Sequence, residues 1–130
     1  MTRINVVPVT ELCDKHLLAE YRELPRVFRL ARPCLDAPKE YVLGPGHVKF
    51  FYDKLGFLGI RLAQIINELN ERGFKATYQE LPDWVEETSS TLWNDYEPTP
   101  KALAINLSRI AERVSQFERT GNKECSNVNG

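Results

Sequence analysis

The spacing of apolar residues is helical almost everywhere in this chain, and it constrains the fold more than any other feature. In the segment from about Val48 to Arg72, apolar side chains recur every three or four residues, at Phe51, Leu55, Leu58, Leu62, Ile65 or Ile66, and Leu69. This period places them on one face of an α-helix. A Gly-Pro-Gly breaker at 44–46 precedes the segment, and Gly73 follows it as a C-terminal cap. We therefore predict a long amphipathic helix here.

A second helix is predicted before this one, from a Thr10 N-cap to about Arg32, where Pro33 ends it. Pro25 lies inside it. Because proline removes a backbone donor and clashes with the carbonyl four residues back, we expect a kink there.

A third helix is predicted to begin with Thr99 as N-cap and Pro100 at its first position. Its expected buried stripe is Leu103, Leu107, Ile110, Val114 and Phe117. The connection before it contains tryptophan and many acidic residues, and one short helix is predicted near Pro82 to Thr88.

Evidence for strands is thin, because the β-branched stretch from Ile4 to Val9 is interrupted by Pro8 and has no partner. The predicted fold class is therefore all-α: a compact single domain of three main helices with an extended N-terminal arm lying across them. We expect the helical domain to span residues 1–119, and residues 120–130 to form a flexible polar tail.

Composition excludes several classes of protein. No apolar run is long enough to span a membrane, and no secretion signal precedes the first helix. Three cysteines, Cys13, Cys34 and Cys125, lie far apart and suit a reducing compartment. With only two histidines beside them, a zinc site is not expected. We predict a cytoplasmic protein, in a bacterium or a phage-infected host cell, that uses no metal and no cofactor.

The net charge of −1 at first argues against a nucleic-acid partner, but the charge is unevenly distributed. Residues 75–99 hold one Lys or Arg against six Asp or Glu, whereas residues 1–32 hold six against four and residues 100–119 hold four against two. Two of the predicted helices are thus basic. A molecule with one positive face is compatible with DNA binding.

The first predicted helix carries its charges on the face opposite its apolar stripe. On a helical wheel Lys15, Arg22, Arg26 and Arg29 form a basic stripe, and Glu23 lies between this stripe and the core, close to His16. One interpretation is a solvated face whose charges pair locally. The other is a binding face for phosphates with a carboxylate at its edge.

The amino terminus offers a nucleophile for the second interpretation. A small residue at position 2 allows removal of Met1, which leaves the amine of Thr2 free. An α-amino group ordinarily titrates about 2 to 3 pH units below a lysine, so more of it is uncharged near neutral pH. If that amine attacked the sugar carbon of a deoxynucleotide, Glu23 could stabilise the developing cation and shuttle protons. Arg3, Arg22 and Arg26 could hold the neighbouring phosphates and keep the carboxylate ionised.

Two sequence blocks carry a resemblance to a known family. The first comprises Thr-Arg-Ile-Asn at 2–5 and Ala-Glu-Tyr-Arg-Glu-Leu-Pro-Arg-Val-Phe at 19–28, and the second is Gly-Pro-Gly-His-Val-Lys-Phe-Phe-Tyr-Asp-Lys-Leu at 44–55. The chain closely resembles the phage endonuclease V family of pyrimidine-dimer DNA glycosylases over about residues 1–119. Lys15, the short connection from Pro33 to Pro45 and the polar tail depart from the family pattern.

The resemblance implies a monomer that acts on double-stranded DNA carrying a damaged base. It would cleave the glycosidic bond at a pyrimidine dimer through an imine on the terminal amine, and then nick the strand by β-elimination. Thr2 and Glu23 would be catalytic. The DNA-binding residues would be Arg3, Lys15, His16, Arg22, Arg26, Arg109 and Arg113.

Two other functions are compatible with the sequence: a catalytically inactive or differently specific DNA-binding relative, and a hydrolase that uses the Thr2 hydroxyl. The absence of predicted strands argues against the hydrolase. Glu20 is assigned to solvent, and His47 to the start of its helix. The aromatic residues are expected to be core and loop anchors: Phe50, Phe51, Tyr52, Trp84 and Trp93.

Overall fold

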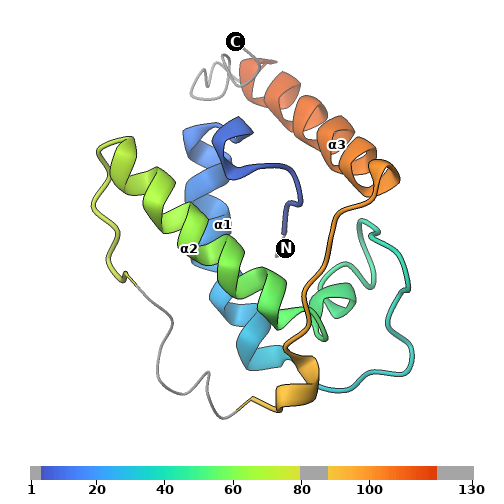
Figure 1. Cartoon of the computed structure of the whole chain (residues 1–130). Coiled ribbons are helices and arrows are strands. Elements are labelled where there is room, and N and C mark those ends of the chain that lie inside the picture. Colours follow the sequence, from blue (N-terminus) through green and yellow to red (C-terminus); the bar gives the residue numbers. More distant parts are fainter. Residues whose placement is uncertain (1–3, 80–87, 120–130) are drawn as a thin grey trace.

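The computed structural model contains three α-helices joined by loops and short 3-10 turns (Figure 1). They are α1 (Asp14–Leu30), α2 (Leu55–Glu71) and α3 (Pro100–Arg119). The structure describes residues 4–79 and 88–119, without the side chains of 115–119. Within those ranges the only β pairing is an isolated bridge between Lys54 and Trp93. The predicted all-α class is confirmed.

Helix α1 begins later than predicted. Thr10 was expected to be its N-cap, but that residue lies in a separate 3-10 turn, η1 (Val9–Glu11), and the N-cap of α1 is Cys13. The reason is that Leu12 is extended, with φ −83° and ψ 140°, which separates the turn from the helix. Pro25 lies inside α1 as predicted, whereas the kink there stays a prediction.

Helix α2 is shorter than predicted at its start, because residues before Leu55 form a 3-10 turn, η2 (Lys49–Phe51), and Lys54 departs from helical geometry. The predicted apolar stripe is confirmed as buried. Gly73 has φ +88°, which favours glycine, and its N–H bonds to the carbonyl of Asn70 while the N–H of Phe74 bonds to that of Leu69. This pair of bonds is a Schellman cap, as the glycine predicted.

Helix α3 begins as predicted, since the hydroxyl of Thr99 accepts a hydrogen bond from the N–H of Ala102 at 3.0 Å and Pro100 follows the cap. Its buried face agrees with the prediction in part: Ile110 is buried, and Leu103 and Val114 are partly buried against the core. Ala102, Asn106 and Ile110 recur every four residues and are buried, whereas Leu107 is 46% exposed. Phe117 and the predicted short helix from Pro82 lie outside what the structure describes.

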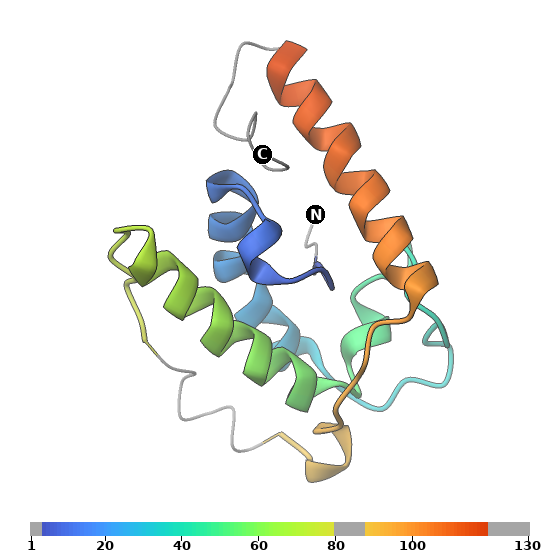
Figure 2. The same cartoon turned by 45° about the horizontal axis from the view of Figure 1, so that its top comes forward.

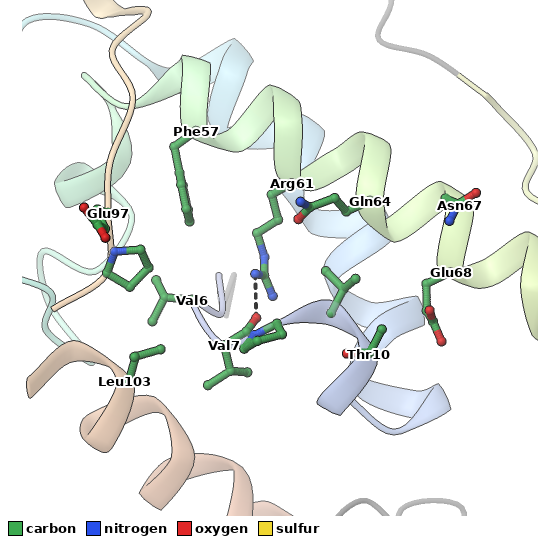
Figure 3. Close-up of a pocket in the computed structure, with 13 residues that line it drawn as sticks. Val6, Val7, Thr10, Phe57, Arg61, Gln64, Asn67, Glu68, Glu97 and Leu103 are labelled. Carbon is green, nitrogen blue, oxygen red and sulfur yellow. Dashed lines mark hydrogen bonds between the residues drawn. The ribbon is translucent and has the colours of Figure 1, made fainter. Parts of the chain in front are cut away.

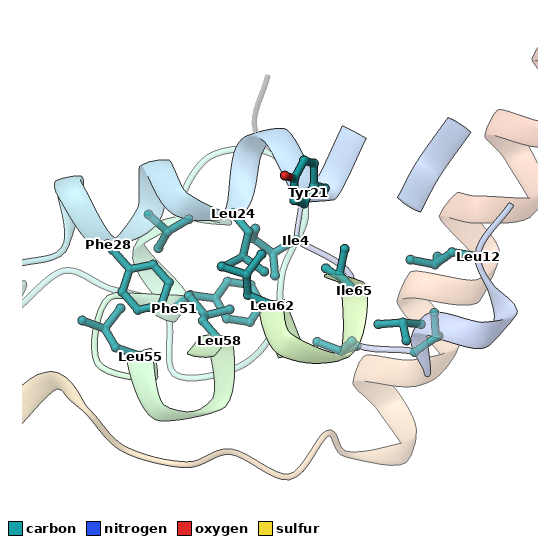
Figure 4. Close-up of a cluster of buried hydrophobic side chains, with 14 of the residues drawn as sticks. Ile4, Leu12, Tyr21, Leu24, Phe28, Phe51, Leu55, Leu58, Leu62 and Ile65 are labelled. Carbon is teal, nitrogen blue, oxygen red and sulfur yellow. The ribbon is translucent and has the colours of Figure 1, made fainter. Parts of the chain in front are cut away.

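The core lies mainly between α1, α2 and the arm (Figure 4). Ile4 of the arm is drawn beside Leu24 of α1 and Leu62 of α2, and all three are at most 1% exposed. The predicted aromatic anchors Phe50, Phe51 and Tyr52 are buried, and Trp93 packs against the core. Trp84 is not among the described residues.

The N-terminal arm is extended, as predicted, and runs between the α1–α2 pair and α3 (Figures 1 and 2). Its residues Ile4 to Val7 are buried. Both views show α3 standing apart from α1 and α2, with the arm between them. The arm is thus the element against which the last helix packs.

Two further expectations can be compared with the structure. Cys34 is a free thiol. None of the described helices is both long and apolar enough to cross a membrane.

Candidate active site

Glu23 lies on α1 at the edge of the core, as the helical wheel predicted. Its side chain is 27% exposed and forms an ion pair with Arg26, at 3.2 Å between Oε2 and Nη1. The guanidinium of Arg26 is 69% exposed, so one face of it remains open to solvent. The carboxylate of Glu23 is therefore held beside a cation and remains partly accessible to solvent.

Arg22 is exposed on α1 and borders a hollow of about 340 Å³. Lys75 lines the same hollow, together with Tyr21 and Tyr78. The two tyrosine rings are stacked with centroids 4.3 Å apart. Burial and the neighbouring Tyr21 raise the pKa of Tyr78 above its ordinary value, so its hydroxyl stays neutral at physiological pH. The hollow therefore combines two cations with two aromatic rings.

Lys15 and His16 lie near the start of α1 and are both half-buried. Nδ1 of His16 is 3.5 Å from Sγ of Cys13. Lys15, Arg22 and Arg26 are all away from the apolar face, which confirms the predicted separation of the basic stripe from the core.

Arg109 and Arg113 lie on α3, whereas Glu23 lies on α1. Arg109 pairs with Glu112 at 2.9 Å and its side chain is 23% exposed, and Arg113 is half-buried. The structure therefore brings Arg22, Glu23 and Arg26 together on α1 and places the two α3 arginines on a separate element.

Thr2 and Arg3 lie outside the described residues, which begin at Ile4. The arm is fixed from that residue on. The N–H of Ile4 donates to Nε2 of His47 at 2.8 Å, and its carbonyl accepts from the hydroxyl of Tyr41 at 3.1 Å. His47 is 2% exposed, and its Nδ1 is 2.8 Å from the carbonyl of Val42. His47 is thus a structural residue as predicted, but its role is to hold the arm.

A buried polar network continues along the arm. Glu20 is 1% exposed and accepts hydrogen bonds from Asn5 Nδ2 at 2.8 Å and from the guanidinium of Arg61, whose Nη2 is at 3.1 Å. Arg61 also donates from Nη1 to the carbonyl of Val7 at 2.7 Å. The assignment of Glu20 to solvent is therefore wrong. The physical reason is that a partner from α2 neutralises it, which permits full burial of its charge.

Asn106 of α3 completes this network. Its Oδ1 accepts from the N–H groups of Val6 and Val7, at 2.7 and 3.2 Å, and its Nδ2 donates to Oδ1 of Asn5 at 2.8 Å. The burial of Asn106 could have been predicted from the helical period, because this residue lies four residues from both Ala102 and Ile110. Arg61 likewise lies three residues after Leu58 and four before Ile65.

A hollow of about 640 Å³ lies away from this site. It lies between the arm, α2 and the start of α3, and its walls include Val6, Phe57 and Leu103 (Figure 3). None of the predicted site residues lines it. We therefore place the candidate site on α1 around Glu23, because the ionisable groups converge there.

Residues 1–80 match a family model described as pyrimidine dimer DNA glycosylase. The chain belongs to this family. The match includes the arm, α1, η2 and α2, and hence Glu23 and the basic stripe. Helix α3, with Arg109 and Arg113, lies beyond it. Membership in this family makes the protein a DNA repair glycosylase with DNA as its substrate.

Proposed function

We propose that this protein is a bifunctional DNA glycosylase and AP lyase that acts on pyrimidine dimers in double-stranded DNA through its terminal amine. Thr2 supplies the nitrogen and Glu23 the carboxylate. The finer mechanism rests on the sequence resemblance, the family and the geometry of the arm.

One observation carries the proposal: the arm is seated against α1 immediately beside the turn that bears Glu23. Asn5 bonds to Glu20, one helical turn before Glu23, and Ile4 lies beside Leu24 (Figure 4). An extended chain advances at most about 3.6 Å per residue, so the two residues that precede Ile4 can reach up to about 7 Å from it. The terminal amine and Glu23 can therefore meet.

The proposed reaction uses the terminal amine of Thr2 and the carboxylate of Glu23. The neutral amine attacks C1′ of the nucleotide, and the bond between C1′ and the base nitrogen breaks with its electron pair going to the departing base. Loss of a proton from the nitrogen and opening of the sugar ring give an imine. Removal of a proton from C2′ then expels the 3′ phosphate and nicks the strand. Glu23 stabilises the cation and carries the protons in these steps.

The cations on α1 provide the DNA contacts in this proposal. Arg22 and Arg26 are exposed beside Glu23, and Lys15 and His16 lie two turns earlier on the same helix. Arg3 of the arm, and Arg109 and Arg113 of α3, would extend the contact to neighbouring phosphates. Beside Arg22, Lys75 lines the same hollow and could add a further contact to phosphate.

The test is reductive trapping. Protein shown by mass spectrometry to begin at Thr2 is incubated with borohydride and duplex DNA that contains a cyclobutane dimer or an abasic site. We expect a covalent adduct whose mass places the DNA on the first residue. In the matched control, one alanine inserted before Thr2 displaces the amine by a residue and should greatly reduce the adduct.

Two results would contradict the proposal. A protein that binds damaged DNA but gives no adduct on any ultraviolet lesion is an inactive relative. An adduct located on a lysine side chain would show that the nucleophile is elsewhere.

A further inference from the structure

The backbone N–H groups of the arm are bonded to side chains, not to a neighbouring strand. Ile4 donates to His47, Asn5 to Glu20 at 3.4 Å, and Val6 and Val7 to Asn106. A β-sheet would provide such bonds from backbone to backbone. Here each bond depends on the identity of one side chain, so the position of the arm can be altered by a single substitution.

Asn106 holds more of the arm than any other side chain in the described network. It is 0% exposed, it accepts from two successive N–H groups, and its amide donates to Asn5, which in turn donates to Glu20. One amide thus fixes three consecutive residues, Asn5 to Val7, and links them to α1. The amide supplies an acceptor oxygen and a donor NH₂ on one side chain, whereas ionised aspartate has no donor and leucine has neither.

Asn106 also ties the arm to the helix that carries Arg109 and Arg113. Helix α3 stands apart from α1 and α2, with the arm between them (Figure 2). Asn106 lies one turn before Ile110, and Arg109 follows it by three residues on the same helix. The placement of α3 and the placement of the arm are therefore coupled through this side chain.

We propose that Asn106 is a positioning residue for the amino-terminal nucleophile. The inference rests on the proposed function, in which the amine of Thr2 attacks the sugar. Asn106 touches neither DNA nor the reacting atoms. It fixes the arm four residues after Thr2, and so determines where the amine stands relative to Glu23.

The expected effect is on rate, not on affinity. A displacement of about 1 Å in a reacting group can reduce a rate by about 100-fold. In the proposed function most of the DNA affinity comes from the cations of α1, chiefly Arg22 and Arg26, which lie on a different helix from Asn106 and outside the arm. Loss of the Asn106 hydrogen bonds should therefore lower kcat and leave the Kd for DNA nearly unchanged.

The experiment compares Asn106→Ala with Ile110→Ala under conditions where circular dichroism shows all proteins to be folded. Ile110 is buried one turn away on α3 and its side chain cannot form a hydrogen bond, so its truncation removes packing from α3 while the Asn106 amide that bonds to the arm stays in place. The readout is the single-turnover rate of borohydride trapping on duplex DNA with an abasic site, measured against pH, with Kd measured on the same DNA. We expect Asn106→Ala to trap at least about tenfold more slowly with Kd within about twofold, and Ile110→Ala to trap at nearly the wild-type rate.

Tyr41→Phe provides a second variant if Asn106→Ala does not fold. It removes only the hydroxyl that bonds to the carbonyl of Ile4 and keeps the ring in the core. The variant should reduce the trapping rate several-fold, again without weakening binding.

The outcomes separate this inference from the function on which it rests. A wild-type protein that gives no adduct overturns the proposed function and, with it, the role of Asn106. A wild type that traps, with folded Asn106→Ala and Tyr41→Phe trapping equally fast, overturns only the positioning role. Equal losses in Asn106→Ala and Ile110→Ala would show that Asn106 acts merely by stabilising α3, and this result also contradicts the proposal.

Discussion

Glu23 is the residue whose environment bears most directly on the proposed chemistry. It sits at the boundary between the core and the basic stripe, where it is accessible and paired with Arg26. Surface ion pairs of this kind contribute only about 0 to 1 kcal/mol to stability. The charge of Glu23 is therefore available for function, and it can be removed without unfolding the protein.

We expect Glu23→Gln to bind damaged duplex DNA with a Kd within about threefold of wild type and to lose at least about 100-fold in strand cleavage, because the amide can neither accept a proton nor stabilise the cation. Binding can be measured by fluorescence anisotropy and cleavage on denaturing gels. Glu71→Gln, an exposed position at the end of α2, is the matched control and should cleave normally. Retained cleavage in Glu23→Gln would mean that another group carries the protons.

The N-terminal arm is the element whose stability depends most on a buried charge pair. Glu20 of α1 and Arg61 of α2 are 0% and 4% exposed at their side chains and reach the arm through Asn5 and Val7. Removal of one member of a buried pair leaves the other charge without compensation, whereas removal of both is often tolerated.

A double-mutant cycle tests this arrangement. Glu20→Leu should lower the free energy of unfolding by about 3 to 5 kcal/mol in urea denaturation, and Arg61→Met by a similar amount. The double variant should lose clearly less than the two single losses added together. The control Glu68→Gln weakens a half-buried pair whose cation, Arg72, keeps a second partner in Asp14, and it should change stability by about 1 kcal/mol or less. Strict additivity in the buried cycle would show that the two side chains do not interact.

Local sequence patterns predicted the helices better than the network that joins them. The cap at Thr99 and the Schellman glycine at position 73 depend on neighbouring residues, and both are confirmed. The burial of Glu20 depends on Arg61, 41 residues away, and Asn106 meets the arm across 100 residues. Such partners are chosen by tertiary packing, so a helical wheel can place a polar residue near the core without identifying what neutralises it. The same limit explains why Leu107 was expected on the buried face of α3, where the structure places Asn106 instead.

The whole molecule combines a near-neutral net charge with a basic stripe on α1. Phosphate contacts release counterions, so each contact contributes about 0.9 to the slope of log affinity against log salt concentration. The number of cations that face DNA can therefore be counted by experiment, even though the net charge is −1.

Arg22→Ala and Arg26→Ala should each weaken DNA binding and reduce the magnitude of this slope by about 0.9, as measured by titrations at several salt concentrations. Lys101→Ala is the control, because Lys101 is an exposed cation on α3, paired with Glu40 at 3.5 Å, that is not among the proposed DNA contacts. For Lys101→Ala, the slope of log affinity against log salt concentration should equal that of wild type. If the two arginine variants keep the wild-type slope, the basic stripe on α1 is not the surface that meets phosphate.

The hydrogen bonds from Val6 and Val7 to Asn106 also have a consequence for biosynthesis. Ile4 and Asn5 meet their partners His47 and Glu20 early in synthesis, but Val6 and Val7 can bond to Asn106 only after α3 has left the ribosome. Helical proteins usually fold fast because their contacts are local, and this long-range closure adds a slower final step. A nascent chain would then complete the seating of its arm only after position 106 has been translated.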